Sequence, residues 1–218
     1  MTTDTVDAEA LAEIAYGIFE IVVNRELCRR GSYLFELVES DRDFWENFQE
    51  IFTGFRDEYP QLAEALEARF GSTEAIYGQL LAGEGVAPSR TTQMYWIVQD
   101  APDFNSAEFD DELGGKWLIF VDPADADAVW RRVRDETSAG RLGISARVST
   151  AKENPDARDG RTVIYVFTRD WSDEADVMRV RERLRELGVT DRIGYKRNIE
   201  TYLGEYSEKG KKVTYYSA

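Results

Sequence analysis

The stretch Lys116-Trp117-Leu118-Ile119-Phe120-Val121, followed directly by Asp122-Pro123, decides the predicted fold of the second half of the chain. Its β-branched and aromatic residues favour a strand, in which Lys116 and Trp117 face opposite sides. An aspartate followed by proline is typical of a helix start, because aspartate caps the first turn and proline fits the first helical position. The stretch therefore predicts a strand that runs into a helix.

Similar short runs surround it and predict further strands. They are Met94–Val98, Ile144–Ser149 and Thr162–Phe167, with shorter pieces near Ile193–Lys196 and Val213–Tyr216. The helix after Asp122 is predicted to bury Val129, Trp130 and Val133. A second helix is predicted to follow Ser172, to bury Val177, Val180, Leu184 and Leu187, and to end at Gly188. We expect an α+β fold, a mainly antiparallel sheet with helices packed on one face.

Residues 1–87 have helical periodicity instead. The apolar stripes expected to face a core are Leu11, Ile14, Ile18, Ile21 and Val22; Phe44, Phe48, Ile51, Phe52 and Phe55; and Leu62, Leu66 and Phe70. Asp7 and Ser72 are the expected caps, the second stripe follows Asp41, the third ends at Gly71, and the last helix ends near Gly83. Since Gly83–Ser89 breaks the pattern, we expect a helical region over residues 1–87 and an α+β domain over 92–218.

The chain is strongly acidic, with a net charge of −15. Such a charge repels phosphate backbones, so no nucleic-acid backbone binding is expected. Arginines far outnumber lysines, and an acid-rich, lysine-poor surface suits a high-salt cytoplasm, where ions screen the repulsion. The composition predicts a halophilic source. An acidic protein from a GC-rich genome is the alternative.

Nothing in the sequence points to export or to a membrane. The single cysteine, Cys28, excludes an internal disulfide and a thiolate zinc site. The first residues lack a basic region followed by an apolar run, and no apolar run is long enough to span a bilayer. A soluble cytoplasmic protein is expected.

Several catalytic templates are excluded because the chain has no histidine. Serine–histidine dyads and histidine metal sites cannot form, and neither GxGxxG nor a Walker loop occurs. Ser149 and Lys152 match the S-x-x-K pattern of penicillin-binding enzymes, but the partner K-T-G is absent. The acidic run Glu108, Asp110, Asp111 and Glu112 lacks calcium-loop spacing and is interpreted as a solvated loop. We expect no metal and no cofactor.

Cations and tyrosines on the predicted strands are the remaining candidate site. If neighbouring strands pair, Lys116, Arg147 and Tyr165 line one cleft, where arginine forks and a phenol suit phosphate oxygens. Arg169, Lys196 and Arg197 are further candidate ligand-binding residues. Trp96, Trp117 and Trp171 lie near predicted strands and would stack a nucleotide base, although core burial is favoured for them.

These segments resemble a known domain. Gly115-Lys116-Trp117-Leu118, Arg147-Val148-Ser149, Tyr165 and the tyrosine-rich tail look like the bacterial effector phosphothreonine lyases and the lyase halves of some lanthipeptide synthetases. They also resemble the uncharacterised basophilic-leukemia-expressed proteins, whose fold is similar to cap-binding translation initiation factors. The resemblance covers roughly residues 92–218, leaves residues 1–87 uncovered, and together with the composition indicates a haloarchaeal member.

The resemblance implies β-elimination of phosphate from phosphothreonine without metal or cofactor. Lys116 falls at a phosphate-contacting lysine, Leu118 at the acid histidine, Arg147 at the lysine base and Tyr165 at a strand tyrosine. Arginine is a poor base and leucine donates no proton, so two roles lack their side chains.

Three hypotheses follow. The first is a catalytically degenerate domain that binds a phosphorylated peptide or another anionic small ligand. The second is an active lyase in which Lys116 and Tyr165 keep their places and Lys152 or Lys196 supplies the base. The third is an interaction module whose acidic helical half binds a protein partner.

Overall fold

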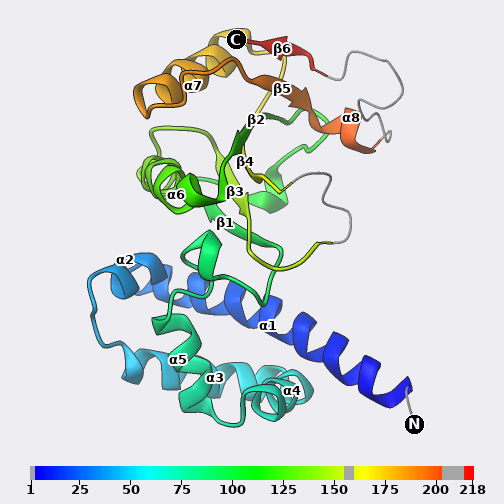
Figure 1. Cartoon of the computed structure of the whole chain (residues 1–218). Helices are drawn as coiled ribbons and strands as arrows, with labels where there is room; N and C mark the ends of the chain where they lie inside the picture. Colours follow the sequence, from blue (N-terminus) through cyan, green and yellow to red (C-terminus); the bar gives the residue numbers. More distant parts are fainter. Residues whose placement is uncertain (1–2, 155–159, 203–213) are drawn as a thin grey trace. The chain divides into compact units, whose positions relative to one another are not determined.

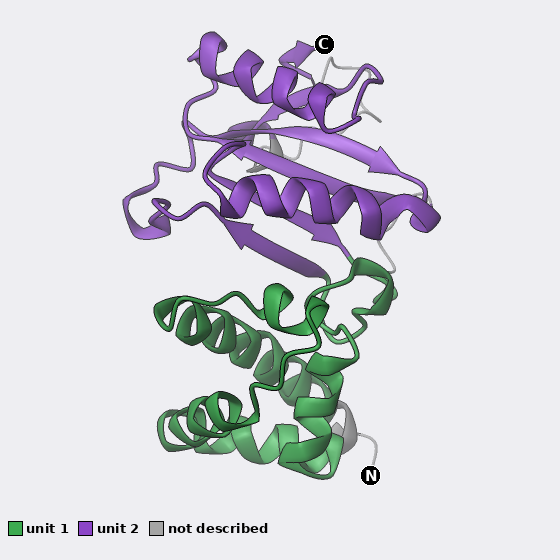
Figure 2. Ribbon diagram, turned by 90° about the vertical axis from the view of Figure 1, so that its left-hand side faces the viewer, with its two compact units in different colours: residues 1–95, 150–155 green, residues 96–149, 156–218 purple. Residues whose placement is uncertain are grey.

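The computed structural model describes residues 3–154, 160–202 and 214–218, and the side chains from residue 8 onward within those ranges, except 201 and 202. The chain divides into two compact units (Figure 2). One contains residues 1–95 and 150–155, and the other contains residues 96–149 and 156–218. The first is helical and the second is a sheet with helices, so the predicted α+β class is confirmed.

Five α-helices and one short 3-10 helix form the described part of the first unit. They are α1 (Thr3–Arg29), α2 (Leu34–Glu39), α3 (Trp45–Glu58), α4 (Pro60–Phe70), α5 (Thr73–Leu81) and η1 (Pro88–Arg90). The predicted end of α4 at Gly71 and the predicted cap of α5 at Ser72 are confirmed. Gly71 adopts a left-handed φ of 89° after α4, and the Ser72 side chain accepts a hydrogen bond from the Ala75 amide at 3.2 Å.

Aromatic rings fill the core of this unit. The Phe19 ring of α1 meets the rings of Phe48, Phe52 and Phe55 of α3 edge-on, with centroids 6.0, 5.4 and 5.2 Å apart. All four side chains are fully buried. The phenylalanine stripe predicted for this helix is therefore a core stripe.

The predicted core face of α1 is wrong for three of its five residues. Leu11, Ile14 and Ile21 are 40%, 59% and 62% exposed, whereas Val22 is buried and Ile18 is half-buried against the core. The buried face consists of Ala12, Ala15, Tyr16, Phe19, Val22, Val23 and Leu27. Because the helix is apolar on both sides, periodicity alone selects either face.

One predicted cap is also wrong. Asp7 cannot cap α1, because that helix already begins at Thr3. The stripe expected after Asp41 lies in and just before α3, which begins at Trp45, and Asp41 itself has a left-handed φ of 50°. The Trp45 amide donates to Asp43 at 3.0 Å, so Asp43 satisfies part of that helix start.

Two carboxyl groups are buried close together in the first unit. The pKa of Glu20 is raised to about 8, chiefly because the carboxyl group is buried; a hydrogen bond from Asn24 opposes this rise, and the nearby charge of Glu84 adds to it. Glu84 accepts hydrogen bonds from the Thr92 amide at 2.9 Å and the Gln93 amide at 3.0 Å. Glu84 therefore holds the segment before the sheet, whereas Glu20 is a buried acid with few polar partners.

The second unit is built on a sheet (Figure 1). Its strands are β1 (Trp96–Asp100), β2 (Gly115–Val121), β3 (Ser145–Ser149), β4 (Thr162–Thr168), β5 (Gly194–Arg197) and β6 (Tyr216–Ser217). Their order is β1-β3-β4-β2-β5-β6, and every neighbouring pair is antiparallel. The predicted strands over 116–121, 144–149, 162–167 and 193–196 are confirmed to within a residue or two, and β1 lies two residues later than expected. The strand predicted near Val213–Tyr216 is found at Tyr216–Ser217, and Val213 lies outside the described residues.

Helices α6 (Pro123–Ser138) and α7 (Glu174–Glu186) pack on one face of this sheet (Figure 2). Asp122 caps α6, as predicted, by accepting from the Ala124 amide at 2.9 Å. The layer between helices and sheet contains Trp117, Trp130, Ile164, Val166, Val177, Val180 and Leu184. Two short helices, η2 (Ser106–Glu108) and α8 (Asn198–Tyr202), complete the described elements.

A buried arginine fastens the end of the chain in the second unit. Arg181 of α7 is fully buried and donates to the backbone carbonyls of Val189, Asp191 and Ala218 at 2.7, 2.7 and 3.1 Å. Burying a guanidinium costs free energy unless its donors are satisfied, and these three carbonyls accept three hydrogen bonds from it, one at each nitrogen.

The segment after β3 returns to the first unit. The Thr150 amide donates to the Tyr95 carbonyl at 3.2 Å, and the Ala151 amide donates to the Pro88 carbonyl at 2.9 Å. Residues 88–95 and 150–155 therefore belong to the first unit, whereas the sequence predicts a boundary between residues 87 and 92. In the described part of the chain, no helix is long and apolar enough to cross a membrane.

Candidate functional site

The sheet face opposite α6 and α7 carries a cluster of cations and aromatic rings. We call it the cation face, and it consists of Trp96, Lys116, Arg147, Tyr165, Phe167 and Lys196. Strand alternation explains the sorting, because Trp117, Val166 and Ala146 point to the helices while their neighbours point the other way.

The strand register places the cluster members side by side. Arg147 of β3 lies opposite Tyr165 of β4, and Lys116 of β2 lies opposite Phe167 of β4 on one side and Lys196 of β5 on the other. The structure thus brings together Lys116, Arg147 and Tyr165, whose convergence the sequence predicted.

Aromatic rings surround the Arg147 guanidinium. Its carbon lies 4.5 Å from the Trp96 ring centroid, 4.9 Å from that of Tyr165 and 5.3 Å from that of Phe167. Trp96 and Tyr165 are themselves stacked, with centroids 5.3 Å apart and an interplanar angle of 26°. Cation–π attraction to three rings restrains the guanidinium, because each ring presents a negative face.

Lys116 is held by an amide relay. Its Nζ donates to Asn198 Oδ1 at 2.8 Å, and Asn198 Nδ2 donates to Asp111 Oδ1 at 2.7 Å. The Asn198 backbone amide also donates to the Gly114 carbonyl at 2.9 Å. Asp111, which the sequence assigned to a solvated acidic loop, therefore positions a cation of the cluster through Asn198.

The electrostatics of the cation face are unfavourable for its own charges. Lys116 and Lys196 are only 5% and 6% exposed. The pKa of Lys116 is lowered to about 8, first by burial and then by the positive charges of Arg147 and Lys196, while Asp111 and Glu200 act in the opposite direction. A bound anion would relieve this repulsion, so the arrangement is suited to binding one.

Arg197 belongs to the other face of the sheet. It alternates with Lys196 along β5 and lies opposite Gly115. Its guanidinium is paired with Glu200 at 3.0 Å and lies 4.9 Å from the Trp171 ring and 4.8 Å from the Tyr215 ring. Of these two candidate ligand-binding residues, Lys196 therefore belongs to the cation face and Arg197 does not.

Lys152 lies in the first unit. Its Nζ forms an ion pair with Glu13 at 2.9 Å, donates to the Gln93 carbonyl at 3.2 Å and lies 4.6 Å from the Tyr95 ring. Ser149, the other half of the S-x-x-K match, accepts a hydrogen bond from the Val163 amide at 2.9 Å in the second unit. Neither contact is that of a nucleophile–base pair.

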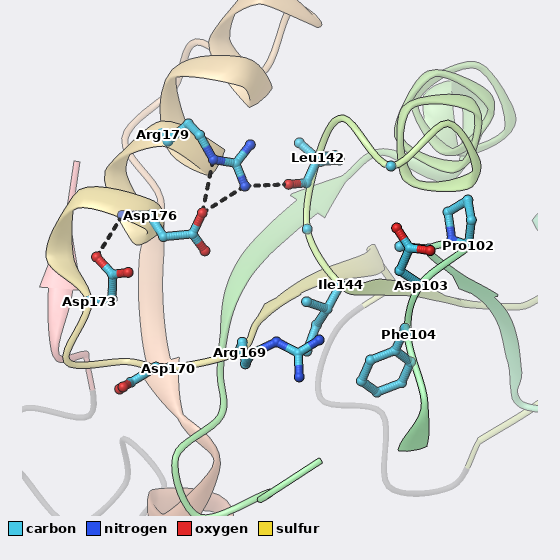
Figure 3. A pocket seen from close by; sticks show the side chains of 13 residues that line it. Pro102, Asp103, Phe104, Leu142, Ile144, Arg169, Asp170, Asp173, Asp176 and Arg179 are labelled. Atoms are coloured by element: carbon cyan, nitrogen blue, oxygen red, sulfur yellow. Dashed lines mark hydrogen bonds and ion pairs between the residues drawn. The ribbon is translucent and has the colours of Figure 1, made fainter. Parts of the chain in front are cut away.

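Arg169 lines a pocket of about 560 Å³ beyond the end of β4 (Figure 3). The wall contains no member of the cation face. Four aspartates, Asp103, Asp170, Asp173 and Asp176, also line it. Arg179 in the same wall is committed to Asp176 at 2.8 Å and to the Leu142 carbonyl at 2.9 Å (Figure 3). The prediction that Arg169 and Arg147 clamp one ligand is not matched by this placement.

The tryptophans divide between core and site. Trp117 is fully buried and its Nε1 donates to the Val177 carbonyl at 3.1 Å, so it cannot stack a ligand base. Trp96 stacks on Tyr165 within the cation face. Sequence reasoning missed Asn198 and Phe167; alternation from Tyr165 could have indicated Phe167, whereas nothing in the sequence marks Asn198. Among the described residues, no group of acidic or cysteine side chains could hold a metal ion.

The fold and the site define a class: an α+β sheet domain that carries a cation cluster on one sheet face and a helical unit at its N-terminal side. The chain belongs to the family described as basophilic leukemia-expressed protein Bles03, whose sequence pattern matches residues 35–204. The match extends into α2–α5, so the expectation that residues 1–87 lie outside the resemblance is wrong for residues 35–87.

Solved structures of cap-bound translation factors are also similar to part of the chain. Schistosome eIF4E with m7GpppA and 4E-BP is 17% identical over 50% of this chain and 62% of its own, with a TM-score of 0.38. C. elegans eIF4E-3 with Mextli and a cap analogue is 17% identical over 56% and 68%, with a TM-score of 0.40. Ascaris suum eIF4E-3 with an m2,2,7G cap is 19% identical over 47% and 61%, with a TM-score of 0.35. The chain thus spans about three fifths of the schistosome and Ascaris proteins.

Proposed function

We propose that the cation face binds a phosphorylated or otherwise anionic small ligand. The observation that supports this proposal is the meeting of Lys116, Arg147 and Lys196 on one sheet face, two of them almost fully buried. Keeping like charges together in a poorly hydrated place costs free energy, which an anion offsets by pairing with all of them. A phosphorylated peptide is the ligand that the resemblance to phosphothreonine lyases suggests.

Each side chain has a distinct role in this proposal. Arg147 offers a planar fork whose orientation the rings of Trp96, Tyr165 and Phe167 restrain. Lys116 offers a point charge whose position Asn198 sets. Tyr165 contributes a phenol that donates to an oxygen of the ligand. No histidine is present in the chain, so binding does not depend on imidazole protonation.

Calorimetric titration with a phosphothreonine peptide, and separately with inorganic phosphate, tests the proposal. Arg147→Ala and Lys116→Ala should each weaken binding by about 1.5–3 kcal/mol, the typical contribution of a hydrogen bond to a charged group. Arg169→Ala is the matched control, since that arginine lies in the wall of a different pocket. Equal loss in the control, or no heat of binding in the unmodified protein, would refute the proposal.

A second candidate function is β-elimination, which the lowered pKa of Lys116 favours. With a pKa of about 8, roughly one tenth of its amine is neutral at pH 7 and able to accept a proton. The base would take the Cα proton of phosphothreonine while the Cβ–O bond breaks and phosphate leaves with the electron pair. Lys196 is the other base available on the same face, whereas Lys152 is committed to Glu13.

Mass spectrometry separates binding from turnover. Elimination leaves a peptide about 18 mass units lighter than the unphosphorylated threonine peptide, and loss of a general base typically costs 10²–10⁴-fold in rate. We expect no such product, because Leu118 occupies the position of the acid histidine in the resemblance. A dehydrated product that disappears in Lys116→Ala but not in Arg169→Ala would instead establish an enzyme.

A further inference from the structure

The exposed side of α1 carries an apolar seam that its own unit covers only in part. Leu11, Ile14, Ile18 and Ile21 follow one another at intervals of three, four and three residues, the spacing of a coiled-coil seam. Leu11, Ile14 and Ile21 are 40–62% exposed, whereas Ile18 is half-buried and packs against the core of the unit. Gly17 lies beside the seam, and a side chain added there would meet no atom within 4 Å.

Exposing isoleucines on an acidic surface is costly in water, because each leaves apolar area hydrated. The opposite side of the same helix already fills the core through Phe19, Val23 and Leu27. The seam is therefore additional to what this unit needs for folding, and an unpartnered apolar stripe of this size marks an interaction surface.

The charges at the two ends of the seam indicate which partner would cover it. Seam positions continue at Asp7 before Leu11 and at Arg25 after Ile21, again at coiled-coil spacing. In an antiparallel pair of these helices centred on residue 16, position 7 lies opposite position 25, position 11 opposite position 21 and position 14 opposite position 18. An antiparallel copy of the helix therefore sets aspartate opposite arginine at both ends and apolar residues opposite one another between them.

A parallel copy would do the reverse. It would place position 7 opposite position 7 and position 25 opposite position 25, so that like charges meet at both ends. The wider helix has the same asymmetry, since its first nine residues contain Asp4, Asp7 and Glu9 and no base, whereas Arg25, Arg29 and Arg30 lie around its end. Charge complementarity thus favours the antiparallel pair.

We infer that α1 mediates self-association of this chain, through an antiparallel pair of seams related by a two-fold axis near residue 16. This inference is independent of the proposed ligand site. One helix from each copy gives a contact near the small end of stable interfaces, so we expect a dissociable dimer.

Sedimentation velocity of the full chain over about 1–200 μM tests association, because a dimer of this size dissociates on dilution. The weight-average mass should rise with concentration in the unmodified protein and stay at the monomer value in Ile14→Glu and Ile21→Glu. Leu81→Glu, at an exposed leucine of α5, is the matched control and should associate normally. Thermal unfolding of each variant checks that the fold is kept. A monomer at every concentration, or equal dimerisation in all variants, would overturn the inference.

Cysteine pairs test the direction of the helices. In a Cys28→Ser background, Leu11→Cys with Ile21→Cys should oxidise to a covalent dimer, while each single variant should not. The reason is distance: positions 11 and 21 meet across an antiparallel pair, but two copies of position 11 are about 15 Å apart at 1.5 Å per residue, too far for a disulfide. Efficient oxidation of the single variants would indicate a parallel pair and contradict the inference.

Charge exchange provides a final check. Asp7→Arg and Arg25→Asp should each weaken the dimer, since each places like charges together at both ends. The double variant, with both charges exchanged, should regain most of the affinity, because the opposite-charge pairs re-form. A double variant as weak as the sum of the single variants would show that positions 7 and 25 do not meet.

Discussion

Lys116 and Lys196 lie directly opposite each other on the neighbouring antiparallel strands β2 and β5, and both side chains are more than nine-tenths buried. Like charges at facing positions of a sheet destabilise the pair. The folded chain keeps these two lysines side by side, so it contains a local cluster of positive charge although its net charge is −15. Such local exceptions concentrate at binding sites.

Anion binding should weaken as Lys116 loses its proton. The pKa of Lys116 is lowered to about 8, so the charged form prevails below that pH and the neutral form above it. We expect the affinity for inorganic phosphate to fall roughly tenfold between about pH 7 and 9.5, since a charge-assisted hydrogen bond is lost. Titration calorimetry across this range measures it. Lys116→Arg keeps its charge and should flatten the profile; a flat profile in the unmodified protein would contradict the assignment.

Asn198 should control the ligand affinity without touching the ligand. Lys116 Nζ lies 2.8 Å from Asn198 Oδ1, so Asn198→Asp places a carboxylate beside the ammonium group. The added negative charge should raise the pKa of Lys116 and neutralise part of the positive charge of the site. Phosphate binding should weaken by about 1–2 kcal/mol. Asn198→Ala, which removes the relay without adding charge, should have the smaller effect. If both variants bind like the unmodified protein, the relay from Asp111 has no role in binding.

Glu20 should make the protein less stable as pH rises. Its pKa is near 4.5 in an unfolded chain and about 8 in the folded one, so the folded state binds more protons between those values. Stability contributed by this group is complete below about pH 4.5 and is lost as pH rises through 8, by roughly 3–5 kcal/mol.

The measurement for Glu20 is urea unfolding at several pH values. Glu20→Gln should remove the slope between about pH 5 and 8, because the amide mimics the protonated acid and cannot ionise. Glu13→Gln, in the same helix, is the control and should leave the slope in place. A slope that survives in Glu20→Gln would assign the effect to another group.

High salt should stabilise the chain. Residues 1–100 contain 19 acids and 7 bases, so carboxylate repulsion is concentrated in the helical unit. Screening of that repulsion should raise the unfolding temperature markedly from low salt to about 1 M KCl, where the Debye length is about 3 Å. Calorimetry with sucrose in place of KCl separates screening from solvent exclusion. No rise with KCl would remove the inference of a halophilic source.

The two predicted domains should not separate cleanly. A fragment of residues 92–218 should stay soluble and keep its sheet, but residues 150–152 lose their partners at Pro88 and Glu13. We expect it to be less stable than the full chain by about 1–3 kcal/mol, the cost of a few lost polar contacts. Circular dichroism during urea unfolding measures the difference. Complete loss of strand signal would mean that the two regions cannot fold apart.

The sheet could be predicted from the sequence because each strand carries its own signal. Lys116 and Trp117 alternate between a cation and a core ring, and the same alternation at Arg147 and Tyr165 fixes which side chains share a face. Neighbouring strands then bring the three site residues together without any further information. Alternation along single strands is therefore enough to predict that Lys116, Arg147 and Tyr165 share one sheet face.

The errors arise where local pattern gives no answer. The first helix has apolar residues on both sides, so Ile14 and Phe19 are equally good core candidates until the rest of the unit is known. Arg169 follows Tyr165 at even spacing but lies past the end of β4, where alternation no longer sets direction. Asn198 acts through tertiary contacts with Lys116 and Asp111, 82 and 87 residues away, which no short motif records.

The return of residues 150–155 to the helical unit also bears on the order of events during synthesis. When residue 95 leaves the ribosome, the first unit still lacks the segment that pairs with Pro88 and Tyr95. That segment appears only after β1, β2, α6 and β3 have been made. The N-terminal unit is therefore completed only after about half of the second unit has been synthesised, and its last contacts form during synthesis of the second unit.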